Sequence, residues 1–186
     1  MKARVILFAV GAVLGTALDR LHVLGGAVSY AEPGAFGQPL WVPPLFGFAV
    51  VGFADLHARL RGALHGEPRT SAQGIARDFV LFAAAYAATA FLPLASWAVA
   101  VLLMAAWAAR AVMVKESRHR VVHALLCGLI GIAFEAMLVR QGAFTHLRAG
   151  FLGTPFWLGP LYMLAAPLIG ELDDLLLPAP ALALQK

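Results

Sequence analysis

Apolar segments, each long enough to cross a bilayer as a helix, recur along the whole chain between short polar loops. A helix crosses the hydrocarbon core in about 20 residues, so this pattern limits the fold to a bundle of membrane-spanning helices. Hydrophobic residues make up 61% of the 186 residues and charged residues 13%, whereas soluble domains carry about a quarter charged residues. We therefore expect one polytopic α-helical membrane domain without an attached soluble domain.

Six segments are expected to span the membrane, and together they form a single domain over residues 1–186. The turn at Pro93 is very short, so the third and fourth spans should form an antiparallel hairpin. No low-complexity tract and no obvious internal repeat is recognised. The expected spans are residues 5–24, 41–60, 75–92, 94–114, 121–139 and 156–176.

The distribution of basic residues predicts how the bundle is oriented. With six spans, both termini lie on one side, together with the second-to-third and fourth-to-fifth loops. That side carries 11 of the 14 Lys and Arg residues, namely Lys2, Arg4, Arg59, Arg61, Arg69, Arg77, Arg110, Lys115, Arg118, Arg120 and Lys186. The other side carries three, Arg20, Arg140 and Arg148. Because basic loops stay in the cytoplasm, both termini should be cytoplasmic, and the dispersed charge gives no reason to expect a nucleic-acid partner.

Small residues predict close contacts between the helices. Helices in lipid gain little from hydrophobicity when they associate, so close approach of their backbones matters more. Gly11 and Gly15 form a G-x-x-x-G step on the first span, and Gly128 and Gly131 form a flat patch on the fifth. The alanine-rich third span should approach the fourth closely. These features describe bundle packing and do not indicate a function.

Three ionisable residues, Asp19, Arg20 and His22, lie at the end of the first span. Asp19 and His22 share a helix face at i, i+3, so catalysis or proton relay is one interpretation. We favour the simpler one, in which Arg20 reaches the interface and Asp19 is paired locally. Long basic side chains near helix ends behave in this way.

Glu116, His119 and His123 are spaced so that one metal ion could contact all three. The sequence offers no second helix with a carboxylate and a histidine, as a di-iron bundle would need. The single cysteine, Cys127, excludes a cysteine-based metal cluster within the chain and should be a small core residue. No metal and no other cofactor is expected.

Glu135 is the most isolated carboxylate within a predicted span. Ionisable groups inside a span are costly and indicate function by default. A neutral Glu135 could donate a hydrogen bond to a lipid or to a neighbouring helix. The alternative is an ion pair with Arg140 near the membrane interface, and both interpretations stay open.

Further ionisable residues gather where the second and sixth spans end, at Asp55 and His57 and at Glu171, Asp173 and Asp174. We expect these positions to be solvated helix ends. No nucleophile elbow, phosphate-binding glycine loop or HExxH motif occurs, so the chain is not expected to be an enzyme.

Two motifs carry a resemblance to a known family. The second span opens with W-V-P-P (Trp41–Pro44), where tryptophan anchors the helix at the interface and proline is tolerated in the first turn. The following loop contains G-E-P (Gly66–Pro68). This pair resembles the second span and following loop of the insulin-induced gene (Insig) proteins. Weaker similarities follow in order at Phe82, Glu116-Ser117-Arg118, Leu138-Val139 with Gly142, Phe156-Trp157-Leu158, and Gly170.

The resemblance implies a six-span fold that binds sterols within the membrane. Insig proteins also retain sterol-sensing partners in the endoplasmic reticulum and couple sterol reductase to degradation. The loop that the family uses for partner contact differs here over Lys115–Arg120, and the Ala, Leu, Gly and Arg bias suits a GC-rich microbial genome. We therefore expect a prokaryotic homologue with the family's fold and lipid pocket, placed in the plasma or inner membrane. A eukaryotic homologue would lie in the endoplasmic reticulum.

We accordingly expect a non-catalytic protein that binds an amphipathic lipid, a sterol or a diacylglycerol-like glycerolipid, in a cavity between its helices. We also expect a homo-oligomer, with a second membrane protein as a further partner. The predicted ligand-binding residues are Phe82, Tyr86, Thr89, Trp97, Trp107, Glu135 and Gln141. Three alternatives stay open: a small transporter or flippase with Asp19, Arg20 and Glu135 along one pathway, an intramembrane enzyme, and a helix-binding scaffold without regulation by lipid.

Overall fold

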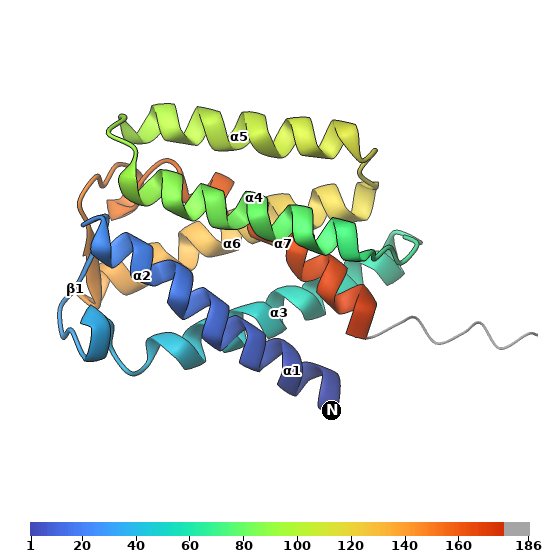
Figure 1. The fold of residues 1–186 in the computed structure, drawn as a ribbon, viewed down its shortest axis with the longest axis horizontal. Coiled ribbons are helices and arrows are strands. Elements are labelled where there is room, and N and C mark those ends of the chain that lie inside the picture. The colour runs from blue at the N-terminus through green and yellow to red at the C-terminus, as the bar shows by residue number, and fades with distance from the viewer. Residues whose placement is uncertain (177–186) are drawn as a thin grey trace, which may run out of the picture.

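Each predicted span coincides with one helical rod of the bundle (Figure 1). The computed structural model describes residues 1–176, so the predicted position of Lys186 lies outside the described residues. The first rod is continuous and consists of α1 (Lys2–Val10), a π-helical turn η1 (Gly11–Gly15) and α2 (Thr16–Leu24). The remaining rods are α3 (Val42–Ala63), α4 (Ala72–Phe91), α5 (Ser96–Met113), α6 (Arg118–Arg140) and α7 (Leu158–Leu176).

Five of these rods are long and apolar enough to cross a membrane: residues 2–24, 35–63, 72–91, 96–113 and 118–140. α7 has 19 residues but carries Glu171, Asp173 and Asp174 in its last turns. The chain is therefore a multi-pass membrane protein in which α7 packs among five apolar rods.

Local sequence signals set several helix ends. Ser71 caps α4, because its Oγ accepts a hydrogen bond of 2.9 Å from the Gly74 N–H. Pro43 and Pro44 lie in the first turn of α3, where the backbone N–H groups have no helical partners. Residues 92–95, which include Pro93, join α4 to α5 and form the predicted hairpin.

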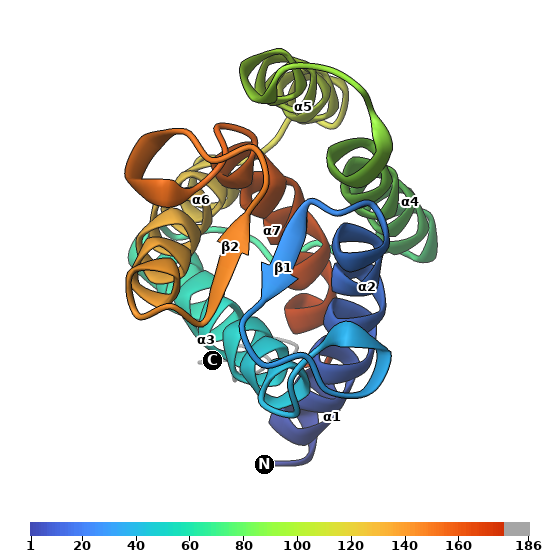
Figure 2. The same ribbon diagram turned by 90° about the vertical axis from the view of Figure 1, so that its left-hand side faces the viewer.

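α7 lies at the centre of the bundle, where it contacts α3, α4, α5 and α6 (Figure 2). Of its 19 residues, 15 are buried. α5 stands at the edge, and a groove separates much of it from α4. The expectation that α4 approaches α5 closely is wrong, because α4 packs mainly against α7 and α2 and touches α5 at few positions. The small side chains of α4 are thus used against the centre of the bundle.

The predicted glycine contacts are present. Gly11 and Gly15 let the first rod approach α3, and a Cβ at Gly15 would lie 2.5 Å from Cγ of Phe46. On α6, a Cβ at Gly131 would lie 2.3 Å from Cδ2 of Tyr162 in α7. Real Cβ atoms do not approach other atoms so closely, so both helix pairs depend on glycine at these positions.

A short antiparallel ladder closes one end of the bundle and faces the viewer in Figure 2. Its strands are β1 (Val28–Tyr30), which follows α2, and β2 (Phe144–His146), which follows α6. Each strand leads into one 3₁₀ turn, η2 (Ala35–Gly37) or η3 (Phe151–Gly153), and then into α3 or α7. We call this the ladder end of the bundle. The opposite end, where α1 begins, is called the ionic end.

The bundle contains two copies of one unit, the segment from α1 to α3 and the segment from α6 to α7. Equivalent residues of the two copies are 116 positions apart in the sequence (26 and 142, 41 and 157). Residues Gly26, Gly37, Pro39, Trp41 and Pro44 of the first copy recur as Gly142, Gly153, Pro155, Trp157 and Pro160. The expectation of no internal repeat is therefore wrong. Most helical positions of the two copies share only their apolar character, but Gly15, Ala49 and Leu56 also recur, as Gly131, Ala165 and Leu172.

The backbone confirms the duplication. Phe36 and Leu152 occupy equivalent positions and share an uncommon left-handed conformation, with φ of 59° and 55°. Ala31 N–H donates to the Ala143 carbonyl, and Leu147 N–H donates to the Ala27 carbonyl, both at 3.1 Å. These two bonds exchange under a twofold rotation, so a pseudo-twofold axis passes through the ladder.

Both copies run in the same direction, because α1–α2 and α6 each lead from the ionic end to the ladder end. Parallel repeats of this kind are related by an axis along the membrane normal. The α4–α5 hairpin belongs to neither copy and is inserted between them. The two copies are therefore related by a pseudo-twofold axis, and the α4–α5 hairpin on one side has no symmetric counterpart.

Candidate functional site

A polar cavity lies beneath the ladder, between the two copies of the unit. Equivalent residues of both copies line it, including Asp19 with Glu135 and Tyr30 with His146. The space open to the centre of a water molecule is about 50 Å³. None of the described residues that line the cavity is a lysine or an arginine. The cavity therefore presents two carboxylates without a neighbouring guanidinium or ammonium group.

Asp19, on α2, accepts two hydrogen bonds at Oδ2. The Tyr30 hydroxyl donates to it at 2.7 Å and the Gln38 side-chain amide at 2.8 Å. Burial and the neighbouring Asp19 carboxylate raise the pKa of Tyr30, so the phenol keeps its proton and donates. The expected local pairing of Asp19 is present, whereas Arg20 turns toward the loop and donates to the Phe36 carbonyl.

Glu135 occupies the equivalent position on α6. The Tyr162 hydroxyl donates to its Oε1 at 2.7 Å, and Nε2 of His146 lies 3.1 Å from its Oε2. The sequence left open a neutral Glu135 that donates to a neighbouring helix; here a neighbouring helix, α7, donates to Glu135 through Tyr162 instead. We call Tyr30–Asp19 and His146–Glu135 the two dyads, because each joins a strand residue to the carboxylate of its own copy.

His22 is a further polar side chain in the cavity wall. Its Nε2 lies 2.7 Å from Oγ1 of Thr89, and its ring stacks on Tyr86 with centroids 4.6 Å apart. The Thr89 hydroxyl donates to the carbonyls of Ala85 and Tyr86, at 3.0 and 2.9 Å, so it accepts its hydrogen bond from His22. Thr89 thus positions the imidazole from α4.

Two apolar grooves continue from the polar cavity, and Ala49 and Tyr162 line all three spaces. The open groove runs between α3 and α6, has a volume of about 390 Å³, and includes the exposed side chains of Phe48 and Ile130. The inner groove runs between the first rod and α7, has a volume of about 70 Å³, and is covered by Phe82 of α4. The open groove therefore adjoins the polar cavity and lies on the lipid-facing side of the bundle.

The two grooves are equivalent features of the two copies. Gly15, Ala165 and Leu172 of the inner groove occupy the positions of Gly131, Ala49 and Leu56 in the open groove. α4 covers the inner groove only. The inserted hairpin thus explains why one of two equivalent grooves is narrow and the other is open.

Four of the predicted ligand-binding residues lie at these spaces. Tyr86 and Glu135 line the polar cavity, and Phe82 and Tyr86 line the inner groove. Thr89 contacts the cavity through His22. Three of them line the cavity or a groove and Thr89 contacts a lining residue, and their role in ligand binding stays a prediction.

Three predicted residues lie elsewhere. Trp107 packs against the hydrophobic core, whereas Trp97 is 64% exposed and Gln141 is exposed beyond the end of α6. Sequence reasoning missed Tyr30 and His146, because both lie in loops between the predicted spans. Their equivalent positions in the repeat are the signal that identifies them.

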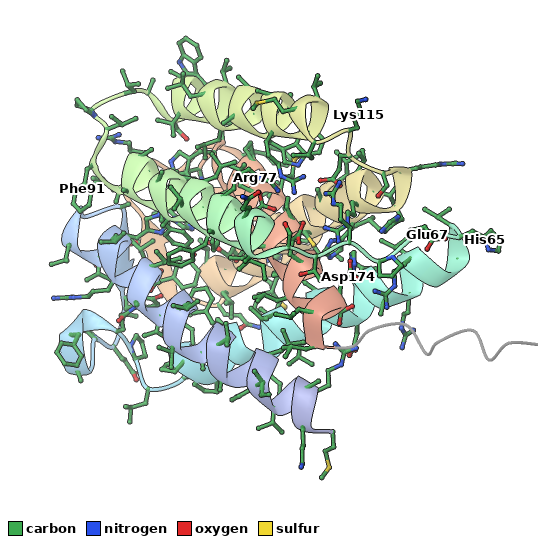
Figure 3. The ribbon with its side chains drawn as sticks, turned by 45° about the vertical axis from the view of Figure 1, so that its right-hand side comes forward. His65, Glu67, Arg77, Phe91, Lys115 and Asp174 are labelled. Carbon is green, nitrogen blue, oxygen red and sulfur yellow. The ribbon has the colours of Figure 1, made fainter. Side chains whose placement is uncertain are left out.

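The ionic end holds a largely buried network of carboxylates and arginines (Figure 3). Arg110 donates to Asp78 through Nη2 at 2.7 Å and through Nε at 3.1 Å, a bidentate pair. In Figure 3, Lys115 and His65 extend away from the bundle, whereas Asp174 lies among the helices. The ion-paired members are Asp55, Asp78, Glu116, Glu171, Asp173 and Asp174 with Arg4, Arg61, Arg69, Arg77, Arg110 and Arg120.

The expectation of solvated helix ends is wrong for His57, Glu171, Asp173 and Asp174, which are each at most 3% exposed. Arginines from several helices turn inward and neutralise these carboxylates, which permits their burial. Asp55 keeps 48% of its side chain exposed and is the one member of this group that behaves as expected.

His57, Asp173 and Asp174 bring one ligand atom each within 4.8 Å of one another, as a metal site requires. Charge argues against a cation there, because the six carboxylates of the network already face six arginines. A divalent ion would add positive charge that no further carboxylate of the network balances. The arrangement fits a structural ion-pair network better than a metal centre.

The predicted Glu116, His119 and His123 set does not converge on one point. Glu116 pairs with Arg69 at 2.8 Å, and Nδ1 of His119 lies 3.1 Å from Oγ of Ser117. His123 bonds a backbone carbonyl of α3 at 2.9 Å. Each side chain thus has its own local partner, which explains its burial without a metal ion.

The fold and the site together define a class of protein. It is a multi-pass helical membrane protein whose two repeated units enclose a pocket that is polar at the ladder end and apolar toward the lipid.

Comparison with known proteins identifies the family. No protein-family model matches the sequence. The INSIG protein homolog of Mycolicibacterium vanbaalenii is 30% identical over 176 residues, which cover 90% of this chain and 85% of that protein. The crystal structure of the mycobacterial Insig homolog MvINS from Mycobacterium vanbaalenii aligns with a TM-score of 0.83 at 26% identity over 97% of each chain. A crystal structure of a cross-linked MvINS trimer aligns with a TM-score of 0.84 at 27% identity over 98% of each chain.

The chain belongs to the Insig family. The resemblance carried by the W-V-P-P and G-E-P motifs is therefore confirmed, and so is the multi-pass membrane class.

Proposed function

We propose that this protein binds an amphipathic lipid in the polar cavity and its grooves, and that it catalyses no reaction on the lipid. The continuity of the three spaces carries the proposal. Ala49 and Tyr162 join the two dyads, at one end, to apolar walls that reach the lipid-facing surface. A ligand with one polar end and an apolar body fits such a pocket, which is mostly apolar with a few placed polar groups.

The dimensions support a sterol or a diacylglycerol-like lipid. The polar cavity has room for a few non-hydrogen atoms, and the open groove is large enough for a hydrocarbon chain or a ring system. A two-chain lipid would place one chain in each groove, and a sterol would occupy the open groove. Tyr86 and Glu135 would contact the polar end, and Phe82 would contact a chain in the inner groove.

Native mass spectrometry of detergent-purified protein, followed by extraction and identification of lipid, tests the proposal. We expect one lipid molecule bound per chain. The variant Gly52→Leu places a side chain in the open groove, where a Cβ at Gly52 has no atom within 4 Å. Gly62 lies on the same helix in equally open space outside the groove, so Gly62→Leu is the matched control.

Gly52→Leu should carry much less lipid than wild type, whereas Gly62→Leu should carry as much. Wild-type protein that never carries lipid above the detergent background would refute the proposal. Equal lipid loss in both variants would show that the open groove is not the binding site.

A transporter is the second candidate, because Asp19 and Glu135 line one cavity. Arg20, the third residue of that predicted pathway, points into the loop instead. A transporter would move lipid between the leaflets of a vesicle, and Glu135→Gln would reduce this flux more than it reduces binding. A binding protein would produce no flux above that of protein-free vesicles.

We further propose that all six rods cross the membrane as one domain, with the ionic end in the cytoplasm. The concentration of basic residues at that end supports this orientation. Neutralisation of the α7 carboxylates by arginine supports the sixth crossing. In a Cys127→Ser background, an impermeant thiol reagent added to intact cells should label Ala149→Cys and not Lys115→Cys.

We also propose that the chain assembles into a homo-oligomer, as the cross-linked MvINS trimer does. Mass measurement of the detergent complex by light scattering tests this proposal. A monomeric complex under conditions that retain bound lipid would refute it.

A further inference from the structure

We propose that the groove between α4 and α5 binds an anionic phospholipid from the leaflet at the ionic end of the bundle, with its phosphate on Arg77 and its acyl chains along the groove. The groove shares no lining residue with the polar cavity or with the two grooves that adjoin that cavity. The inference therefore concerns a separate site and does not depend on the function proposed above.

The groove has the size and the position that a phospholipid of this leaflet requires. Its volume is about 840 Å³, and its lining comes mainly from the half of each helix that is nearer the ionic end. Small and apolar side chains form both walls, so a hydrocarbon chain can lie against the helix backbones. They include Ala76, Val80 and Ala84 of α4 with Ala106, Ala109 and Met113 of α5.

Arg77 presents an unused hydrogen-bonding edge at this groove. Its Nε donates to Oδ1 of Asp78 at 2.7 Å, and neither of its Nη groups donates to another side chain or carbonyl within residues 1–176. The side chain is 40% exposed and lies between α4 and α5 in Figure 3. Two free Nη groups can bind two oxygens of one phosphate, which is a strong and specific geometry for a guanidinium group.

The carboxylate beside Arg77 is already neutralised from its other side. Arg110 donates to Asp78 through Nη2 at 2.7 Å and through Nε at 3.1 Å, so one carboxylate faces two guanidinium groups. Arg110 also pairs with Glu116, which has a second partner in Arg69. Because Asp78 is 1% exposed, an anion at the groove would meet the guanidinium of Arg77 rather than the carboxylate.

The exposed charges beside the groove are basic. From the start of α4 to the start of α6 the chain has two acidic residues, Asp78 and Glu116, and their side chains are at most 3% exposed. Lys115 and Arg118 are exposed where α5 ends and α6 begins. Glu67, an exposed carboxylate of the loop before α4, lies away from the groove in Figure 3. Basic pockets between helices on the cytoplasmic side of a membrane bind anionic head groups in this way.

Arg77 also favours a lipid over a helix of a second copy as the occupant. An apolar helix in the groove would cover the two Nη groups without giving them an acceptor, and buried donors without a partner destabilise a complex. A phosphate supplies acceptors and a compensating charge at the same point. The acyl chains then cover the small side chains of the walls.

Native mass spectrometry of the full-length, delipidated protein in detergent tests the inference with two short-chain lipids. The probes are dioctanoyl phosphatidylglycerol, which is anionic, and dioctanoyl phosphatidylcholine, which has the same chains and phosphate but no net charge. We expect the anionic lipid to bind at least about tenfold more tightly, because the basic residues beside the groove repel the choline group.

The variant Arg77→Gln tests the phosphate contact. It removes the guanidinium group and leaves Asp78 paired with Arg110. Its affinity for dioctanoyl phosphatidylglycerol should fall about tenfold, and the preference over phosphatidylcholine should disappear. Arg59→Gln removes an exposed basic residue of α3 outside the groove, so it is the matched control and should keep the preference.

The variant Ala109→Phe tests the groove without a change of charge. Ala108 and Ala109 are neighbouring exposed residues of α5, and of the two only Ala109 lines the groove. A phenyl ring at position 109 occupies space that the acyl chains need, so the affinity for dioctanoyl phosphatidylglycerol should again fall about tenfold. Ala108→Phe is the matched control and should bind as wild type does.

Three results would overturn the inference. Equal binding of the two lipids by the wild-type protein would show that the groove takes membrane lipid without selection. A preference that survives in Arg77→Gln would exclude Arg77 as the phosphate contact. Loss of an oligomer in Ala109→Phe, measured by light scattering, with lipid binding unchanged would assign the groove to a second copy. None of these results bears on lipid in the polar cavity, which Gly52→Leu tests separately.

Discussion

Asp78 and Arg110 form a deeply buried ion pair of the ionic end, with 1% and 4% of their surfaces exposed. Removing Arg110 leaves Asp78 with Arg77 alone and Glu116 with Arg69 alone, and the loss of one partner from a buried ion pair costs about 3–5 kcal/mol. We therefore expect Arg110→Met to lower the free energy of unfolding in detergent by about this amount. The double variant with Asp78→Leu should recover much of the loss, because apolar pairs often replace buried ion pairs without cost.

Arg118→Ala, at an exposed position of the same end, is the control and should leave stability within about 0.5 kcal/mol of wild type. Denaturant unfolding followed by tryptophan fluorescence measures all the variants. A double variant as unstable as Arg110→Met would show that the pair contributes more than neutralisation of Asp78.

The residues that sequence reasoning located are those whose environment depends on their own helix. Gly15 and Gly131 were placed at helix contacts because a G-x-x-x-G step or glycine patch is a local pattern. The burial of Asp173 and Asp174 was missed, because the arginines that neutralise them come from other helices. Tyr30 and His146 were missed for a similar reason, since only the ladder brings these loop residues over the cavity.

The helices can be predicted from the sequence more readily than the ladder can. Every rod lies within a few residues of a predicted apolar segment, because a long apolar run is a local pattern that marks a helix in the sequence. The strands β1 and β2 have three residues each and carry no pattern of their own. Their pairing depends on the duplication, which brings equivalent segments to the same end of the bundle.

The register of the ladder yields a direct test. Ser29 and Thr145 lie directly opposite each other and are both exposed, and directly opposed antiparallel residues have a separation suited to a disulfide. We expect Ser29→Cys with Thr145→Cys to form an intrachain disulfide under mild oxidation. Altered mobility in a non-reducing gel, reversed by reductant, detects it.

The native Cys127 is buried and should not react. Ser29→Cys with Leu147→Cys is the matched control, because position 147 is opposite Ala27 in the ladder. Cross-linking of the control pair as fast as the Ser29 and Thr145 pair would contradict the register and with it the pseudo-twofold axis.

At the scale of the whole molecule, the inserted α4–α5 hairpin breaks the near-twofold symmetry of the two repeated units. The two repeated units share one polar cavity and two equivalent grooves. α4 covers the inner groove with Phe82 and leaves the α3–α6 side free. A lipid that exchanges with the membrane would therefore enter between α3 and α6, the helices that carry Gly52 and Ile130.

The proposed lipid should stabilise the bundle. A ligand that binds only the folded state stabilises it by about 2.7 kcal/mol at a free concentration 100 times its dissociation constant. The cavity lies between the two units, so a lipid that fills it contacts both and should oppose their separation. Exhaustive delipidation should therefore lower the unfolding temperature by several degrees, and dioctanoylglycerol should restore it in a concentration-dependent manner.

Gly52→Leu should not respond to the added lipid, whereas Gly62→Leu should respond as wild type does. Intrinsic fluorescence during heating measures the transition, since the described residues include all four tryptophans. Restoration of equal size in Gly52→Leu would place the stabilising lipid on the outer surface of the bundle. A wild-type transition that delipidation leaves unchanged would mean that the two units hold together through the ladder, the glycine contacts and the ionic end alone.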